Sequence, residues 1–207
     1  PGAFADMLHR NAQAGGYDFV LIDCPPGNPL LQEAALAAAR YVLVPVRTDA
    51  MSWDGLYGVG PLVRRAREAN PALTYLGAVL FASQTTASRP RAAARLTLGE
   101  ITDTIPLLTA FIRHSETAGA DASLRGQLAH ELARDAAALR EQRLKALRAR
   151  QPGQPLTLPA LSGSARGVAD DYAALLREIV HRIGELEARR DPDEHHSAER
   201  TETVAAR

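Results

Sequence analysis

The sequence predicts an α/β fold, a mostly parallel sheet with flanking helices in a doubly wound arrangement. Short apolar runs bounded by turn residues alternate with Ala- and Leu-rich helical stretches over the first half of the chain. Strands that alternate with helices are joined by crossover connections, and such connections make neighbouring strands parallel. The apolar runs are therefore expected to form one sheet, with the helices packed against it.

The predicted strands are short runs that begin and end at turn signals. The first contains four consecutive apolar residues, so we expect a strand buried on both faces. Glycine and proline separate the elements, because Gly15 and Gly16 stop the first helix and Pro71 stops the third. The predicted strands are residues 17–23, 41–46, 75–81 and 109–112. The predicted helices between them are residues 3–14, 30–40, 52–69 and 88–103.

The second half of the chain is predicted to be mostly helical. Residues 123–150 read as one long charged helix, and the Pro- and Gly-rich residues 151–166 read as a loop. Residues 167–188 carry apolar side chains at helical spacing and are expected to form the final helix. The tail, residues 189–207, is charged and has few large apolar residues, so we expect disorder. The α/β domain would then span residues 1–188.

Composition excludes several classes of protein. The 24 basic and 24 acidic residues cancel, so a chain-wide nucleic-acid footprint is not expected, although local basic patches are allowed. The single cysteine, Cys24, excludes an internal disulfide framework and a Cys-rich zinc site, and we expect it to be a small buried side chain. No apolar run is long enough for a transmembrane helix, and the cytoplasm is the expected compartment.

The most informative position is Asp23, at the end of the first predicted strand. In open α/β sheets, ligands bind beyond the carboxyl ends of the strands. A carboxylate there can hold Mg²⁺ through a retained water shell, although it can also simply cap a turn. The turn that follows at once, Pro25-Pro26-Gly27, favours the functional interpretation.

At this point the sequence resembles a known family. Residues 17–26, YDFVLIDCPP, look like the Walker B segment of the ParA/Soj/MinD family of partition ATPases, which have a P-loop NTPase fold. Further similar passages follow in the order that the family has them. They are residues 34–39 with 42–46, Asp54-Gly55-Leu56, Asn70-Pro71 before residues 76–80, residues 112–118, and Asp170-Asp171-Tyr172. The resemblance covers about residues 3–188, and the order of the passages is more specific than any one of them.

The resemblance implies roles for matching residues. Asp23 would be the catalytic Walker B acid, which holds Mg²⁺ through a water. Pro25, Pro26 and Gly27 would form the turn beside the γ-phosphate of ATP. Residues near the nucleotide base would be Ser83, Gln84 and Arg113, although the family often has Pro where this chain has Arg113.

The intact family member binds ATP and Mg²⁺ as a nucleotide-sandwich homodimer. It binds DNA nonspecifically, responds to a ParB-like partner, and works in the cytoplasm on the nucleoid during chromosome or plasmid partitioning. We expect no membrane binding of the MinD kind, because the C-terminal tail lacks an amphipathic apolar face.

The phosphate-binding loop is the main departure from the family. The chain has no Gly-Lys-[Ser/Thr] sequence, and its one lysine, Lys145, lies among arginines in a predicted helix. We expect a truncated sequence rather than true loss of the loop, and no ATP hydrolysis by this chain alone. The alternative is a non-catalytic binding module that has lost the loop.

Two arginine clusters are candidate contacts to phosphate. Arg89, Arg91 and Arg95 are the predicted DNA-binding residues. A second cluster lies between residues 134 and 150, where a solvated helix face with i,i+4 ion pairs is the favoured interpretation.

Overall fold

The computed structural model describes residues 2–24, 27–47, 50–83, 92–93, 105–149 and 161–205. The chain divides into two compact units. The first is Pro1–Leu80 with Arg89–Leu107, and the second is Phe81–Ser88 with Leu108–Arg207. Within the described ranges, no helix is both long and apolar enough to cross a membrane.

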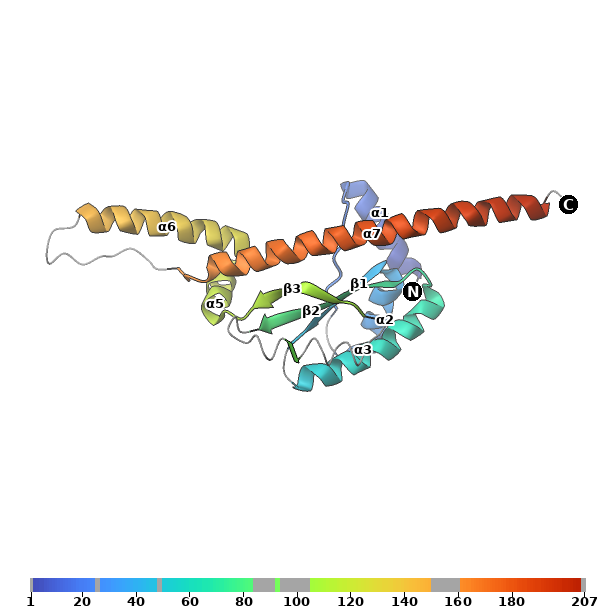
Figure 1. The fold of residues 1–207 in the computed structure, drawn as a ribbon, viewed down its shortest axis with the longest axis horizontal. Helices are drawn as coiled ribbons and strands as arrows, with labels where there is room; N and C mark the ends of the chain where they lie inside the picture. The colour runs from blue at the N-terminus through green and yellow to red at the C-terminus, as the bar shows by residue number, and fades with distance from the viewer. Residues whose placement is uncertain are drawn as a thin grey trace. The chain divides into compact units, whose positions relative to one another are not determined.

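The sheet has three strands, in the order β1-β2-β3 (Figure 1). They are β1 (Tyr41–Val46), β2 (Thr74–Ser83) and β3 (Leu107–Arg113). The β1–β2 pair is parallel, with a shift in register between Val42 and Leu43. The central strand is the most deeply buried, and Ala78 and Leu80 are 0% exposed. The predicted α/β fold with a parallel sheet is therefore confirmed, and three of the four predicted strands are present.

The helices of the first unit lie close to their predicted positions. They are α1 (Gly2–Gly15), α2 (Pro29–Ala38) and α3 (Ala50–Ala69). The amide of Asn70, just after α3, donates to the carbonyl oxygens of Leu36 at 3.1 Å and Ala39 at 2.7 Å. This side chain satisfies carbonyl groups at the end of α2, and so it joins the ends of two helices.

The first predicted strand is not formed. Residues 17–24 have no regular secondary structure, and Leu21 is 97% exposed and Phe19 64% exposed. A strand forms only where its N–H and C=O groups pair with a neighbour, and no described strand pairs with this segment. The prediction of a strand buried on both faces at residues 17–23 is thus wrong, although the segment contains the apolar residues on which the prediction is based.

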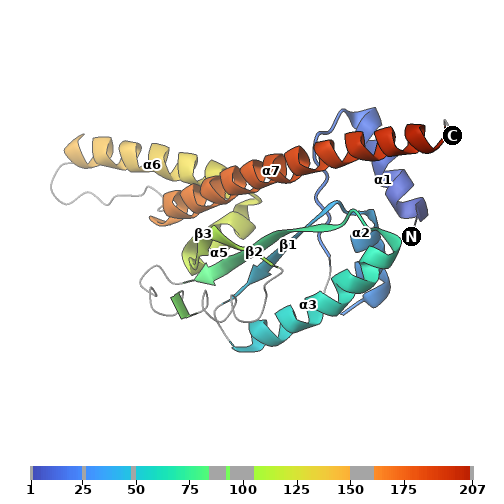
Figure 2. The same cartoon turned by 45° about the vertical axis from the view of Figure 1, so that its right-hand side comes forward.

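The second unit contains α5 (Glu116–Arg125), α6 (Ala129–Ala149) and α7 (Ala165–Ala205), shown from two sides in Figures 1 and 2. The single helix predicted over residues 123–150 is wrong, because Gly126 ends α5. Its φ is +62°, in the left-handed region, and its N–H donates to the carbonyl of Ala122. Glycine adopts this conformation without steric cost, and a helix commonly ends there.

A small core joins the three helices of the second unit. Ala118 of α5, Leu132 of α6 and Ala165 of α7 are buried together. The final helix is longer than predicted, since α7 continues to Ala205 where the sequence predicts a disordered tail. Alanine, glutamate and arginine, which are frequent in that segment, are good helix formers. Apart from the helical residues 92–93, the predicted helix over residues 88–103 lies outside the described residues, as does most of the predicted loop over 151–166.

Candidate functional site

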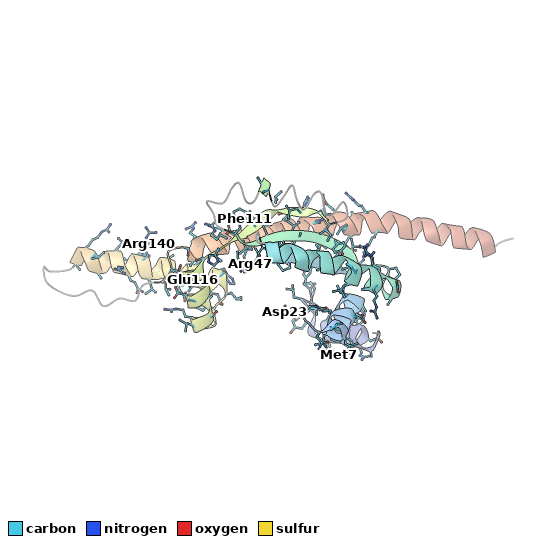
Figure 3. The ribbon with its side chains drawn as sticks, turned by 90° about the horizontal axis from the view of Figure 1, so that it is seen from below. Met7, Asp23, Arg47, Phe111, Glu116 and Arg140 are labelled. Atoms are coloured by element: carbon cyan, nitrogen blue, oxygen red, sulfur yellow. The ribbon has the colours of Figure 1, made fainter. Side chains whose placement is uncertain are left out.

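Asp23 lies on the irregular connection between α1 and α2 (Figure 3). Its side chain is exposed, and it has no hydrogen-bond or ion-pair partner among the described residues. A carboxylate without a protein partner keeps its capacity to accept hydrogen bonds from a metal-bound water. Asp23 is therefore exposed on an irregular segment, whereas the sequence predicts it at the end of a strand.

The turn after Asp23 leads directly into α2. Gly27 has φ +82°, so a side chain at this position would be strained. The side chain of Asn28 then caps the helix, since its Oδ1 accepts a hydrogen bond from the N–H of Leu31 at 3.2 Å. Pro29 occupies the first turn, where its missing N–H costs nothing. Gly27, Asn28 and Pro29 thus encode a left-handed backbone position followed by a helix start.

Cys24, next to Asp23, is exposed rather than buried as predicted. Its segment is not part of the sheet, so no neighbouring strand covers the thiol. Partial loss of hydration raises the pKa of the Cys24 thiol, and the negative charge of Asp23 raises it further.

The end of β2 holds another predicted site residue, Ser83. Ser83 is 1% exposed, and its hydroxyl has no hydrogen-bond partner among the described residues. The preceding residue, Ala82, has a left-handed φ of +52°. Unpartnered buried hydroxyls and left-handed non-glycine residues both cost free energy, and they are enriched at binding sites.

Arg113 ends β3 beside Ser83, because the N–H of His114 donates to the Ser83 carbonyl at 2.8 Å. Its guanidinium, however, is held by Asp171 of α7. The Nε–Oδ2 distance is 2.6 Å and the Nη2–Oδ1 distance is 2.8 Å. This hydrogen bonding raises the pKa of Arg113 above its ordinary value. Ser83 and Arg113 therefore meet at one edge of the sheet, but Arg113 already has an anionic partner.

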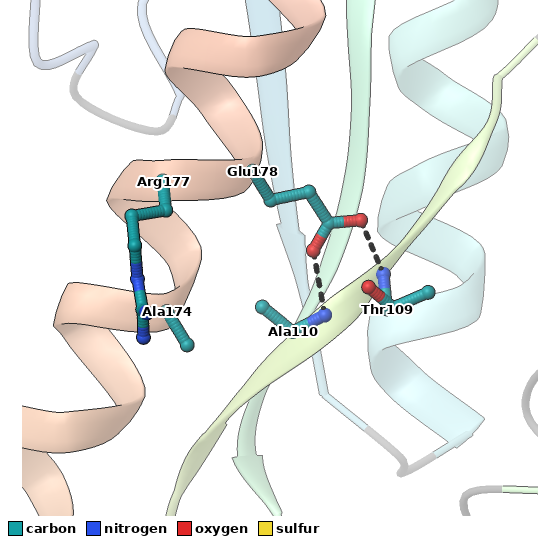
Figure 4. Close-up of a pocket in the computed structure, with 5 residues that line it drawn as sticks. All are labelled: Thr109, Ala110, Ala174, Arg177 and Glu178. Carbon is teal, nitrogen blue, oxygen red and sulfur yellow. Dashed lines mark hydrogen bonds between the residues drawn. The ribbon is translucent and has the colours of Figure 1, made fainter.

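A second carboxylate of α7 binds the backbone of β3 (Figure 4). The two oxygens of Glu178 accept hydrogen bonds from the N–H groups of Thr109 and Ala110, both at 2.7 Å. These residues line a shallow pocket together with Ala174 and Arg177. Glu178 stands seven positions after Asp171, on the same side of the helix, so α7 is attached to β3 at two points.

The helix starts of α5 and α7 share a group of hydroxyls. The Oγ of Ser164 lies 2.5 Å from the Oγ of Ser115 and 2.7 Å from the Oγ of Ser162. The N–H of Ser162 also donates to Asp121 at 2.9 Å. Serine is a preferred residue at a helix start, which explains the clustering without a ligand.

Sequence reasoning missed Asp171, Glu178 and this serine group as site-forming residues. The sequence signal for the two acids was their separation of seven residues on a helix that has an apolar face. That signal identifies a shared face but not the partner, which lies on a strand far away in the chain. Several predicted site residues lie outside the described residues: Pro25, Pro26, Gln84, Arg89, Arg91 and Arg95.

Asp23 and its surroundings fit a hydrated Mg²⁺ but do not fit a nucleotide phosphate chain. The exposed carboxylate of Asp23 can accept from a metal-bound water. No group of three or more His, Cys, Asp or Glu side chains that could hold a metal directly occurs in the described part of the chain. The only lysine, Lys145, is on α6, where its Nζ lies 2.8 Å from Glu141. The compact unit that contains Asp23 therefore has no lysine to neutralise phosphate.

Residues 4–75 match the AAA domain family. The chromosome partitioning protein ParA of Caulobacter vibrioides is 37% identical over 76 residues, which are 36% of this chain and 28% of that protein. The chromosome-partitioning ATPase Soj of Thermus thermophilus is 41% identical over 63 residues, 30% of this chain and 25% of that protein. The match thus spans about a quarter of the length of these relatives. The predicted resemblance to ParA and Soj is confirmed over this part of the chain.

A solved structure is also similar. The cobyrinic acid a,c-diamide synthase from Mycobacterium smegmatis, crystallised with an ATP analog and magnesium, aligns with a TM-score of 0.48 and 24% identity. The alignment covers 77% of this chain and 57% of that one.

Proposed function

We propose that this chain is the Walker B portion of a ParA-like ATPase with a doubly wound P-loop fold, and that the intact protein partitions a chromosome or plasmid. The observations that carry the proposal are the match of residues 4–75 to the AAA domain family and the similarity of 76 and 63 residues to ParA and Soj. Residues 4–75 contain Asp23, whose exposed carboxylate has no protein partner among the described residues.

The state of residues 17–22 supports a phosphate-binding loop supplied by sequence outside these 207 residues. Apolar side chains that belong in a sheet are exposed here, with Tyr17 at 70% and Val20 at 49%. A strand placed beside this segment would pair its backbone and cover those side chains. In the family, the strand that leads into the P-loop lies in that position.

The proposed site has a metal side and a base side. Asp23 would hold Mg²⁺ through a water, and Pro25, Pro26 and Gly27 would form the turn near the γ-phosphate. When bound, ATP supplies the phosphoryl group and Mg²⁺ neutralises its charge. Ser83 and Gln84 would lie near the base, and the unpartnered hydroxyl of Ser83 supports that placement.

Arg113 is the least supported member of the base side. Its guanidinium is bound by Asp171 at two positions, so a contact to a nucleotide would require that pair to open. We therefore assign Arg113 to the attachment of α7 rather than to the nucleotide.

In the intact protein, two copies would close over two nucleotides, and a ParB-like partner would stimulate hydrolysis. DNA would be bound without sequence preference, with Arg89, Arg91 and Arg95 as the predicted contacts. The protein would act in the cytoplasm, on the nucleoid, without binding a membrane.

The first experiment extends the chain upstream in its own gene. An in-frame Gly-x-Gly-Lys-[Ser/Thr] loop supports the ATPase, and the extended protein should bind Mg-ATP where the 207-residue chain binds it weakly or not at all. In the extended protein, Asp23→Asn should lower turnover by about 10- to 100-fold, with a smaller loss of ATP affinity.

Asp18→Asn is the matched control, because Asp18 is exposed in the same segment and has no proposed role. Equal turnover in wild type and Asp23→Asn would remove Asp23 from the mechanism. An upstream sequence without the loop would instead favour the non-catalytic binding module.

A further inference from the structure

The outer half of α6 is an exposed and strongly basic helix. Residues 139–149 contain four cationic side chains and one acidic side chain, Glu141. Leu132, near the start of the helix, is 1% exposed, whereas nearly every residue after Arg140 is exposed. Figures 1 and 2 both show α6 extending beyond the N-terminal end of α7. The four exposed cations are Arg140, Arg143, Lys145 and Arg148.

The cations are spread across one outward face. At about 100° per residue, Arg140, Leu144 and Arg148 form a line along the helix, with Arg143 on one flank and Lys145 on the other. Arg140 and Arg148 are about 12 Å apart along the axis at ~1.5 Å per residue. The half-buried residues of this segment, Leu139 and Ala146, lie on the opposite face.

This arrangement suits a double-stranded nucleic acid. The major groove admits an α-helix and has a phosphate chain on each side, so a helix with cations on both flanks can contact both chains. The ion pair between Lys145 and Glu141 does not prevent this, because both side chains are about 70% exposed, at 72% and 68%. Such a pair contributes little to stability, and Lys145 can exchange it for a phosphate.

We propose that the outer half of α6 is a sequence-independent contact site for the phosphate backbone of duplex DNA. The proposal rests on the DNA-binding part of the proposed function and adds a site to it, since the sequence placed the contacts at Arg89, Arg91 and Arg95. Arginine and lysine bind phosphate without reading bases, and each contact releases counterions from the DNA.

The test is a salt titration of the 207-residue chain, without nucleotide, against a labelled duplex of random sequence. Replacing Arg140, Arg143, Lys145 and Arg148 with Gln keeps the helix propensity and removes the charge. The slope of log K against log salt should flatten by roughly 0.9 per lost contact, and the low-salt affinity should fall by at least about tenfold. Circular dichroism should show unchanged helix content.

Two matched variants separate the effect of charge from that of exposed apolar surface. Changing Arg140, Arg143 and Arg148 to Lys should leave the slope unchanged, because Lys also neutralises phosphate. Leu144→Ala with Leu147→Ala should also leave it unchanged. These leucines are 49% and 45% exposed, and they would matter for a protein or membrane partner.

The outcomes are distinguishable. DNA binding by wild type with the same slope in the Gln variant overturns the α6 site only. No DNA binding by wild type overturns the α6 site. The DNA-binding part of the proposed function concerns the intact, ATP-bound dimer, so the same titration of the extended protein with Mg-ATP tests it separately. Binding to anionic vesicles that depends on the two leucines, with no change of DNA slope in the Gln variant, assigns this face to a membrane instead.

Discussion

The guanidinium of Arg113 and the carboxylate of Asp171 form a two-point ion pair that joins the end of β3 to the start of α7. The backbone N–H of Arg113 donates to the same carboxylate, at 3.0 Å from Oδ2. The Asp171 side chain is 10% exposed and that of Arg113 is 30% exposed, so the pair is partly shielded from water. One carboxylate thus satisfies both the side chain and the main chain of a strand end.

Asp171→Asn should destabilise the protein. The variant loses the negative charge and at least one of the hydrogen bonds, and it leaves the guanidinium of Arg113 only partly paired. Because Arg113 keeps some contact with water, we expect a loss of about 1–2 kcal/mol in the free energy of unfolding. Urea denaturation measures it. Asp170→Asn is the control, since the neighbouring Asp170 is exposed and its ion-pair distance to Arg166 is 3.9 Å. An equal loss of unfolding free energy in both variants would contradict this role for Asp171.

Two glycines of α7 should respond in opposite ways to alanine. A Cβ on Gly167 would lie 2.7 Å from Cζ of Arg113, so Gly167→Ala should push the guanidinium away from Asp171. A Cβ on Gly184 would meet nothing within 4 Å, and Gly184→Ala should stabilise the helix by about 0.5–1 kcal/mol. Thermal unfolding compares the two. Stabilisation of similar size in both variants would show that Arg113 moves aside at no cost.

Glu178→Gln should weaken the hydrogen bonds between the backbone of β3 and α7. The carboxylate accepts from two adjacent amides, and a glutamine side chain offers only one oxygen. One amide then loses its partner, and we expect a loss of about 1–2 kcal/mol. Hydrogen exchange should show faster exchange at Thr109 or Ala110. Glu185→Gln, on an exposed part of the same helix, serves as the control, and unchanged exchange at both amides would rule out this role for Glu178.

Alkylation of Cys24 should be slow at neutral pH and should accelerate as pH rises. Partial burial and then the charge of Asp23 raise the thiol pKa, so the reactive thiolate is a smaller fraction than in a free cysteine at any given pH. Asp23→Asn removes the negative charge, lowers the pKa and should speed alkylation at a fixed pH. Iodoacetamide labelling followed by mass spectrometry gives the rate. Asp18→Asn should have no effect, and identical rates in wild type and Asp23→Asn would show that the two side chains are not coupled.

The strands and helices of the sheet region were largely predictable because their signals are local. The apolar run of β1 coincides with the observed strand, and Asn70-Pro71 ends α3 as predicted. The end of α5 at Gly126 was also encoded locally, yet the surrounding Ala- and Leu-rich sequence favoured a continuous helix. A glycine inside a helical pattern can either continue or end the helix, and only the observed left-handed φ distinguishes the two.

The candidate site was predictable only in part. Asp23 and its turn follow from the DCPPGNP sequence, because proline, glycine and asparagine dictate a turn and a helix start. The partner of Arg113 did not follow, since Asp171 is 58 residues further along the chain. No periodicity within either segment contains that information.

The sequence by itself determined where the turns and helix starts lie and that the fold is α/β. These features depend on backbone preferences and apolar patterning that act over a few residues. Only the tertiary structure decided that residues 17–21 are exposed, that Cys24 is exposed as well, and that Asp171 and Glu178 bind β3. Burial and strand pairing depend on which segments pack together in the fold. Local sequence patterns do not identify a packing partner that is distant in the chain.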